Sequence, residues 1–357
     1  MPRATYLSWL DSTKTPTPAP WDLEHPDGPT APVDNAAFLA EVFSTVESEI
    51  ERQDPDLARR LDRLKVVVTP NPAHLDETGP HVIAMLWGDN FARVPYWADD
   101  VGLVMAVNRG RRFLDSTRML PRPLGWAELA DEVRVTAERA IWARQGHRPR
   151  TRVEDIFAMP LGYSHQRERP FVPWEEREID AFFAGSTIFT TDRGGALRQR
   201  LRAGGLAVKT LHRNAMVAAM ESLRDERPDL NVLLDIMPSN QVTDKRDEYS
   251  DRMAQTRFSI DPRGTSRESF RFFEAARVGA VPVVTSLPSG GLYAGAPALR
   301  LRHWTELGPA MRRMTARPEE ALALHEGVQD WYRRQASPEA TAQRLVPRVK
   351  AVLRRLT

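Results

Sequence analysis

Residues 257–286 constrain the fold more than any other stretch, because their pattern is that of a strand, a loop, a helix and a second strand in turn. Residues 258–261 form a short apolar run that predicts the first strand. Pro262-Arg263-Gly264 ends that strand, since proline cannot donate to a sheet and glycine tolerates unusual backbone angles. Residues 281–285 are apolar again and predict the second strand. This order favours a parallel pair joined by a right-handed crossover.

The helix between the two strands has signals at both ends. Thr265 stands three residues before Glu268, the spacing of a capping box, which predicts a helix that starts at Thr265. Gly279 is placed to end the helix just past its last turn. The loop 262–266 would then lie at the carboxyl end of a strand and the amino end of a helix, where open α/β sheets bind ligands. Free backbone N–H groups and the helix dipole favour an anion at such a place.

Charged residues surround this predicted anion site. Arg263 and Arg267 add positive charge to the loop, and Arg267 lies four residues before Arg271. Arg271 and Glu274 are three residues apart, so they share one face of the helix. A carboxylate there can accept hydrogen bonds from two ribose hydroxyls, and a neighbouring cation can hold a diphosphate. The alternative is an ordinary surface ion pair on a buried strand–helix–strand unit.

The spacing of these residues resembles the signature of exostosin-like glycosyltransferases. A second match, Phe183-Ala184-Gly185, resembles the F-x-G strand and turn that opens the carboxyl-terminal half in that family. The resemblance covers residues 180–290, and the chain departs from it at Ser259, where many members carry cysteine. The residues that carry the resemblance in the central stretch are P-R-G at 262–264, Ser269-x-Arg271-x-x-Glu274-Ala275 and Gly279-x-x-Pro282-Val283-Val284.

The resemblance implies a GT-B fold. This is an α/β architecture of two Rossmann-like parallel-sheet domains that face each other across a cleft, with a C-terminal helix that packs back on the first domain. It also implies that Ser269, Arg271 and Glu274 belong to a sugar-nucleotide site. With the loop and the F-x-G turn included, the predicted donor-binding residues are Gly185, Arg263, Gly264, Thr265, Ser266, Arg267, Ser269, Arg271 and Glu274.

The activity implied is transfer of a hexosyl or glycuronosyl group from a nucleoside-diphosphate donor, with a UDP-sugar favoured, to an acceptor hydroxyl. Inversion at the anomeric carbon is implied by the family. Two alternatives stay open: a fucosyltransferase-like enzyme with a GDP-sugar donor, and a non-catalytic sugar- or nucleotide-binding protein of GT-B shape. The nucleotide sugar is a substrate, so no cofactor is expected. The acceptor, a glycan or a small molecule, is left open.

Length and composition are consistent with this interpretation. A chain of 357 residues suits two domains. We predict a first domain over 1–165, a linker over 166–176, a nucleotide-sugar-binding domain over 177–335 and a returning helix over 336–357. The absence of cysteine excludes disulfides and thiolate sites, and a net charge of +2 gives no indication of nucleic-acid binding. No apolar run reaches the length of a transmembrane helix, so a cytoplasmic location is expected.

The first half of the chain shows four apolar runs, and continuous apolar runs are typical of strands buried on both faces of a parallel sheet. These predicted strands are 5–10, 64–69, 81–87 and 101–107, with predicted helices over 35–53 and 126–142 and a long loop over 13–34. Asp34 or Asn35 is expected to cap the first helix. In the second half we predict strands over 179–186, 231–236 and 299–304, and helices over 196–202, 214–225, 247–255, 319–334 and 338–356.

An inverting transfer needs a group that takes the proton of the acceptor hydroxyl. We predict Asp89, because Gly88-Asp89-Asn90 follows the longest apolar strand of the first domain. The alternatives are Asp11, His74 and Asp99, and Asp89 could instead cap its own turn. The only D-x-D, at residues 54–56, follows no buried strand, so no metal site is predicted. The charge of the leaving diphosphate would then be met by arginines and backbone N–H groups.

Overall fold

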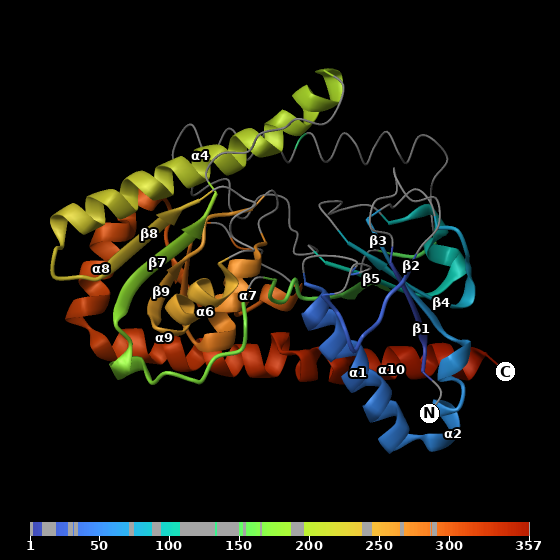
Figure 1. The fold of residues 1–357 in the computed structure, drawn as a ribbon. Coiled ribbons are helices and arrows are strands. Elements are labelled where there is room, and N and C mark those ends of the chain that lie inside the picture. Colours follow the sequence, from blue (N-terminus) through green and yellow to red (C-terminus); the bar gives the residue numbers. More distant parts are fainter. Residues whose placement is uncertain are drawn as a thin grey trace. The chain divides into compact units, whose positions relative to one another are not determined.

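The computed structural model describes residues 3–8, 19–27, 31, 35–70, 75–87, 94–107, 133, 150–152, 155–164, 166–186, 196–237, 245–264, 268–285, 287 and 291–356. The chain forms two compact units, each built on its own sheet (Figure 1). The first unit comprises Met1–Arg109, Ala137–Ser164 and Arg333–Thr357. The second comprises Gly110–Thr136 and His165–Tyr332, and so includes the described part of the predicted linker.

The first unit contains a six-stranded sheet in the order β2-β1-β3-β4-β5-β6. All neighbouring pairs are parallel except β1 and β2. The predicted parallel sheet is therefore confirmed, but the edge strand β2 lies where a loop over 13–34 was predicted. The strands are β1 (Thr5–Ser8), β2 (Ala19–Pro20), β3 (Lys65–Thr69), β4 (Gly79–Leu86), β5 (Val101–Ala106) and β6 (Phe157–Ala158).

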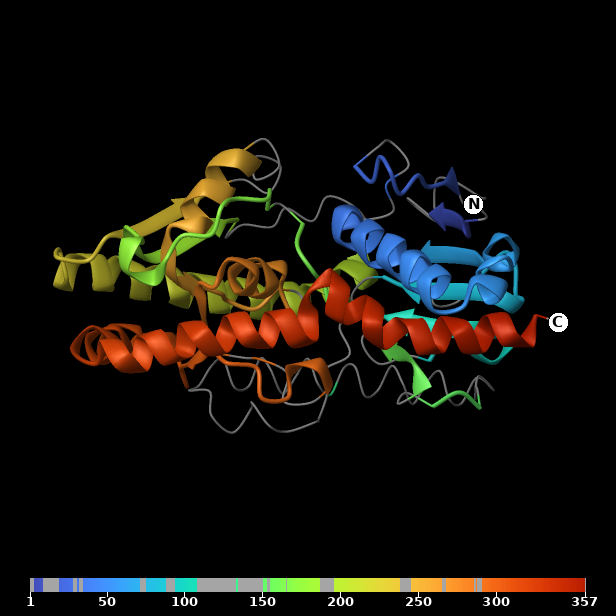
Figure 2. The same cartoon turned by 90° about the horizontal axis from the view of Figure 1, so that it is seen from below.

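Helices α1 (Ala36–Gln53) and α10 (Pro338–Arg355) run side by side in the first unit (Figure 2). A buried stripe on α10, which includes Leu345, Val349 and Val352, packs on α1, β4 and β5, so the predicted return of the C-terminal helix is confirmed. The short helices of this unit are α2 (Pro55–Ala58), η1 (Leu61–Arg63) and η2 (Tyr96–Asp100). Of the predicted helix 126–142, Val133 alone is among the described residues, and it is helical.

The start of α1 is fixed by contacts with the segment that follows β6. Asn35 precedes the helix as predicted, but its side chain caps nothing. Its Nδ2 instead donates to the carbonyl oxygen of Leu161 at 2.6 Å, which replaces the predicted capping bond. Gly162 has a φ of 66° and lies against the ring of Phe38, which is fully buried. Only glycine adopts this backbone conformation without strain while leaving room for the ring.

The second unit contains a five-stranded parallel sheet in the order β11-β10-β9-β7-β8. At its centre, β9, α7 (Phe270–Val278) and β10 form the predicted strand–helix–strand unit. Gly279 ends α7 with a φ of 75°, as predicted. The strands are β7 (Ile179–Gly185), β8 (Val232–Ile236), β9 (Thr256–Ile260), β10 (Val281–Val284) and β11 (Leu299–Arg300).

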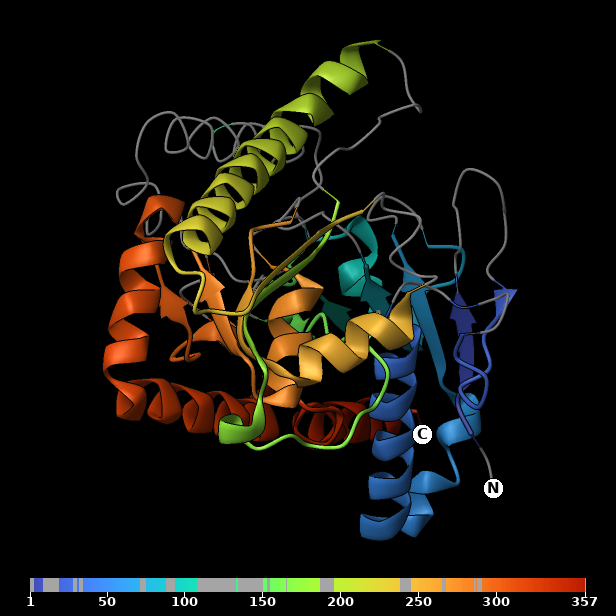
Figure 3. The same cartoon turned by 60° about the vertical axis from the view of Figure 1, so that its left-hand side comes forward.

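Helix α4 (Ala196–Glu226) corrects one prediction of the sequence analysis. A break at Gly204-Gly205 was expected between two helices, whereas Figure 3 shows one unbroken helix. Each interior glycine costs only about 1 kcal/mol relative to alanine. Burial of Met216, Met220 and Leu223 against the sheet outweighs that cost.

The remaining helices of the second unit flank this sheet. The predicted strand 299–304 is shorter than expected, because η6 (Trp304–Glu306) and α8 follow β11 closely. Helix α8 was not predicted at all. The helices and short helical turns are α6 (Arg246–Ala254), α8 (Leu307–Ala316), α9 (Pro318–Trp331), η4 (Trp174–Glu176) and η5 (Gly291–Tyr293). The π turn Tyr332–Ala336 follows α9, and the second unit ends at its first residue.

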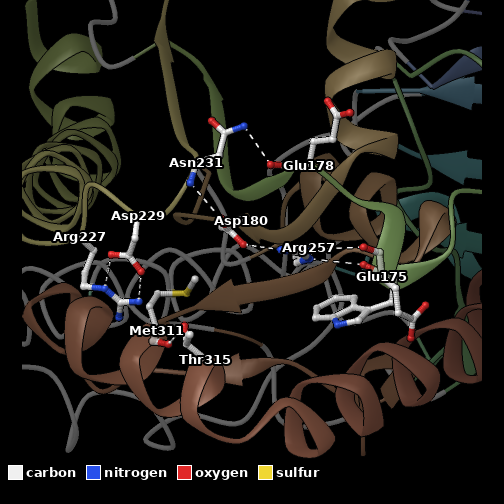
Figure 4. A network of polar contacts seen from close by, with 10 residues as sticks. Glu175, Glu178, Asp180, Arg227, Asp229, Asn231, Arg257, Met311 and Thr315 are labelled. Atoms are coloured by element: carbon white, nitrogen blue, oxygen red, sulfur yellow. Dashed lines mark hydrogen bonds and ion pairs between the residues drawn. The ribbon is translucent and has the colours of Figure 1, made fainter.

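A polar network holds the amino ends of β7, β8 and β9 together (Figure 4). Arg257 Nη1 lies 2.8 Å from Asp180 Oδ1, and Asp180 Oδ2 accepts from the backbone N–H of Asn231 at 2.9 Å. The side-chain amide of Asn231 donates to the carbonyl oxygen of Glu178 at 2.9 Å. This edge of the sheet is thus tied by contacts within the protein. The carboxyl edge is where open α/β sheets generally bind ligands.

Of the helices that the structure describes, none has both the length and the apolar character needed to cross a bilayer.

Candidate functional site

The carboxyl edge of the second sheet contains two arginines that bind the end of β7. The ladder between β7 and β9 ends at the pair Phe182 and Ser259. Beyond that pair, the carbonyl oxygen of Ala184 accepts a hydrogen bond from Arg271 Nη2, and the carbonyl oxygen of Ser186 accepts one from Arg213 Nη1. Guanidinium groups therefore take the place of a neighbouring strand at this edge.

Arg271 is held by all three residues of the F-A-G motif. Its Cζ lies 4.5 Å from the ring centroid of Phe183, a cation–π contact, and it donates to Ala184. Gly185 has a φ of 154°, and a Cβ there would lie 2.9 Å from Arg271 Nη2. Glycine thus leaves room for the guanidinium. The two motifs that were recognised separately in the sequence meet at this contact.

Arg213, on α4, was missed by the sequence analysis. It is buried, and burial together with the smaller effect of the nearby charge of Arg271 lowers its pKa to about 9, whereas the charge of Asp261 opposes the change. A signal was present, since Arg213 precedes the buried residues Met216 and Met220 by three and seven positions. A charged residue on the apolar face of a helix needs a specific partner or a ligand.

Asp261 follows β9 and is buried. Its carboxylate accepts a hydrogen bond from Ser269 Oγ. Burial raises the pKa of Asp261 to about 6. Arg271, the bond from Ser269 and Arg213 all act in the opposite direction. Ser269 is also the N-cap of α7 and accepts from the backbone N–H of Phe272 at 3.4 Å. The predicted helix start at Thr265 is therefore wrong: α7 begins one turn later, because Ser269 supplies the cap.

Glu274 is buried on α7, and its Oε2 accepts a hydrogen bond of 2.6 Å from the hydroxyl of Tyr249 on α6. The side chain of Gln166 donates to the carbonyl oxygen of Glu274 at 3.0 Å. Burial raises the pKa of Tyr249 well above its usual value, and the charge of Glu274 is the second largest cause of this rise. Tyr249 therefore stays protonated and donates to Glu274. A role of Glu274 in holding ribose remains a prediction.

Three predicted donor-binding residues, Thr265, Ser266 and Arg267, lie outside the described residues. The other six belong to the second unit. Arg263 is buried and Gly264 is half-buried, directly after Asp261. The structure brings Gly185 and Arg271 into contact and couples Asp261 electrostatically to Arg271 and Glu274.

Among the candidate bases, Asp89, Asp11 and His74 lie outside the described residues. Asp99 is described, in the first unit. Its carboxylate accepts hydrogen bonds from Arg150 N, Thr151 N and Thr151 Oγ1, each at 2.6 Å. These hydrogen bonds lower the pKa of Asp99, and the bond from the Thr151 hydroxyl has the largest effect, ahead of the bond from the backbone N–H of Arg150. A carboxylate bonded in this way is a weak base, so Asp99 is poorly suited to take the acceptor proton.

The D-x-D at residues 54–56 has local partners. Asp54 caps α2 by accepting from the backbone N–H of Leu57 at 3.2 Å, and Asp56 pairs with Arg59. Within the described part of the chain, no three histidine or acidic side chains gather in a way that could hold a metal ion.

No protein-family model and no curated protein sequence matches the chain. The fold class therefore rests on the structure itself: two Rossmann-like α/β units, each with a parallel sheet, with the C-terminal helix packed on α1 of the first unit.

Asp261 should make stability depend on pH. Because its pKa is raised from 3.8 to about 6, the folded state binds more protons than the unfolded state between these values. The stabilisation is fully present below the unfolded pKa and is lost as pH rises through the folded pKa. We expect a loss of about 2 kcal/mol between pH 4 and pH 7 that is absent in Asp261→Asn. Urea unfolding of both proteins across this range measures it, and parallel pH profiles would contradict it.

Proposed function

We propose that this protein is a glycosyltransferase of the exostosin-like kind, with a GT-B fold. It transfers a sugar from a nucleoside-diphosphate donor, most favourably a UDP-sugar, to an acceptor hydroxyl with inversion at the anomeric carbon. The single observation that carries the proposal is the contact of Phe183, Ala184 and Gly185 with Arg271. It supports the resemblance, because the residues of the two motifs lie far apart in the chain and have a joint function only if they meet.

The position of Arg271 suits recognition of a diphosphate. It lies at the carboxyl edge of a parallel sheet, near the amino end of α7, where backbone N–H groups and the helix dipole favour an anion. A guanidinium presents a planar fork of donors that matches phosphate oxygens. Its half-buried position keeps it reachable while reducing the screening of its charge by water.

The proposed reaction is a direct displacement. The acceptor oxygen forms a bond to the anomeric carbon as its proton passes to a base, for which Asp89 is our candidate, and the bond from that carbon to the diphosphate oxygen breaks. The nucleoside diphosphate leaves with the bonding electrons. Its charge is met by Arg271, with Arg263 and Arg267 as further candidates. Stabilisation of developing charge by such fixed donors commonly contributes more to catalysis than any other effect.

Two other functions are separable by experiment. A fucosyltransferase-like enzyme would bind GDP in preference to UDP, and a non-catalytic binding protein would release no nucleotide from its donor. A thermal-shift screen of nucleoside diphosphates is the first test, because a ligand at a hundred times its Kd adds about 2.7 kcal/mol of stability. Hydrolysis of the matching nucleotide sugar without acceptor then distinguishes an enzyme from a binder. No shift with any nucleoside diphosphate would contradict the proposal.

Arg271→Ala and Glu274→Ala are each expected to weaken nucleoside-diphosphate binding by roughly ten- to a hundredfold. Loss of a hydrogen bond to a charged group costs about 1.5–3 kcal/mol. Isothermal titration calorimetry measures the change. Arg257→Ala is a matched control, because Arg257 is in the same sheet but in the network at the opposite edge (Figure 4). Equal affinities in wild type and both site variants would remove these residues from the donor site.

Turnover is expected to survive chelation. The D-x-D at 54–56 makes local contacts, and arginine side chains are the groups proposed to meet the diphosphate charge. Initial rates with and without EDTA test this expectation. Complete loss of turnover in EDTA, restored by Mn²⁺ or Mg²⁺, would show that a metal site exists.

A further inference from the structure

We propose that Arg213 and Arg271 form a two-cation site for a phosphate group, and that Asp261 is the internal counter-ion whose negative charge the bound phosphate replaces. The identity of the anion as the diphosphate of a nucleotide donor rests on the proposed function. The two-cation site itself rests on the contacts of α4, α7 and β9 at one edge of the second sheet.

The two arginines are held side by side at the end of β7. Arg271 and Arg213 donate to carbonyl oxygens two residues apart, those of Ala184 at the end of β7 and Ser186 just after it. Their charges are close enough that Arg271 lowers the pKa of Arg213. The guanidinium of Arg271 has five N–H donors, and the carbonyl oxygen of Ala184 does not use them all. Among the described residues, Arg271 Nε has no hydrogen-bond partner.

The charges around Asp261 make it a counter-ion of the two arginines. Its carboxylate is attracted by the charges of Arg271 and Arg213 and accepts a hydrogen bond from the hydroxyl of Ser269. Glu274 accepts from Tyr249, and Glu268 acts on Tyr293. Because Asp261 interacts with the charges of both arginines, we take it as their counter-ion. The groups that face it are Arg213 from α4, Arg271, Glu274 and Ser269 at α7, Tyr249 from α6 and Tyr293 from η5, with Glu268 next to Tyr293.

Together these points predict that anion binding is coupled to proton uptake. A phosphate that reaches both arginines brings negative charge next to Asp261, and burial already disfavours the charged form of this carboxyl. Asp261 then takes one proton from solvent, becomes neutral, and leaves the arginines to the ligand. The pKa of Asp261 before the phosphate binds is about 6. At higher pH, each further unit should lower the affinity of the wild type for phosphate by up to about tenfold, and this loss should be absent in Asp261→Asn.

The test is calorimetric titration of inorganic pyrophosphate and of UDP into the full chain at pH 5.5 and pH 7.5, in two buffers of different ionisation enthalpy. The proteins are wild type, Asp261→Asn, Arg213→Lys and the control Asp180→Asn. Asp180 is a partly buried aspartate of the same sheet, paired with Arg257 at the opposite edge. The buffer pair gives the number of protons taken up, and comparison with Asp261→Asn removes the titration of the ligand itself.

We expect Asp261→Asn to bind pyrophosphate about tenfold more tightly than wild type at pH 7.5, with nearly one proton fewer taken up. Arg213→Lys should bind it about tenfold more weakly, and Asp180→Asn should behave as wild type. Unchanged or weaker binding by Asp261→Asn, with the proton uptake of wild type, would overturn the inference. If Arg213→Lys does not fold, Asp261→Asn still decides.

The two ligands separate this inference from the proposed function. If the protein binds pyrophosphate but neither UDP nor any other nucleoside diphosphate, the two-cation site is supported and the proposal of a glycosyltransferase is contradicted. If it binds a nucleoside diphosphate and Asp261→Asn has no effect, the proposed function is supported and the role of Asp261 as counter-ion is contradicted. Binding of neither ligand by the wild type would contradict both.

Discussion

Gly162→Ala is expected to destabilise the first unit by about 4 kcal/mol. A left-handed backbone costs an alanine about 1–2 kcal/mol, and forcing an extra atom into a packed core costs about 1–3 kcal/mol more. Gly162 has a φ of 66°, and an added Cβ would overlap the ring of Phe38. That ring is fully buried at the start of α1 and packs edge-on against the ring of Tyr163, with 5.5 Å between the ring centroids. Denaturant unfolding with a probe in the first unit measures the loss.

Gly291→Ala is the matched control for this effect. Gly291 has a similar φ of 60°, but a Cβ there would meet no atom within 4 Å. This variant should therefore lose only the backbone contribution, about 1–2 kcal/mol, which a probe in the second unit measures because Gly291 belongs to that unit. The difference between the two variants isolates the contact with Phe38, and Phe38→Leu should recover part of the loss in the Gly162→Ala background. Equal losses at the two glycines would contradict the steric argument.

Asp89→Asn is expected to lower kcat by roughly a hundredfold or more while donor affinity is kept. The substitution keeps the shape of the side chain and removes its basicity, and the transfer needs a base to take the acceptor proton. Asp89 was selected from its place in the sequence, after the run that forms β4. Steady-state kinetics, together with direct titration of the donor, separates loss of chemistry from loss of binding.

A variant that turns over at the wild-type rate would return the role of base to Asp11, His74 or Asp99. Asp99→Asn is an informative companion. Its carboxylate is held by Arg150 and Thr151, so we expect this substitution to affect the stability of that segment more than kcat. A large loss of kcat in Asp99→Asn, with Asp89→Asn unaffected, would reverse the assignment.

Local patterns were sufficient to predict the core of the second sheet. The strand–helix–strand unit of β9, α7 and β10 is marked by apolar runs, a proline–glycine break and Gly279, all of which act within a few residues. Helix α4 was predicted as two pieces because propensity disfavours Gly204-Gly205. The burial of Met216 and Met220 that outweighs this penalty involves residues distant in the chain.

In the candidate site, too, local patterns predicted single residues but not the contacts between distant parts of the chain. Arg271 and Gly185 were found from motifs, but their contact joins α7 to β7 and could not be read from either motif alone. The cap of α7 was assigned to Thr265 because the spacing to Glu268 suited it, although Ser269 was an equally good capping residue. Arg213 was missed because its partner, the carbonyl oxygen of Ser186, is a backbone atom that carries no mark in the sequence.

The position of α10 determines when the first unit can complete its folding during synthesis. This helix follows the whole second unit in the chain, yet its apolar stripe packs on α1, β4 and β5 of the first unit. On the ribosome, domains usually fold as units as they emerge. Here the parts of α1, β4 and β5 that α10 covers stay exposed until residues 338–355 have been translated, after the last residue of the second unit. The first unit begins synthesis first and completes its folding last, and for that interval its exposed surface is a natural binding site for chaperones.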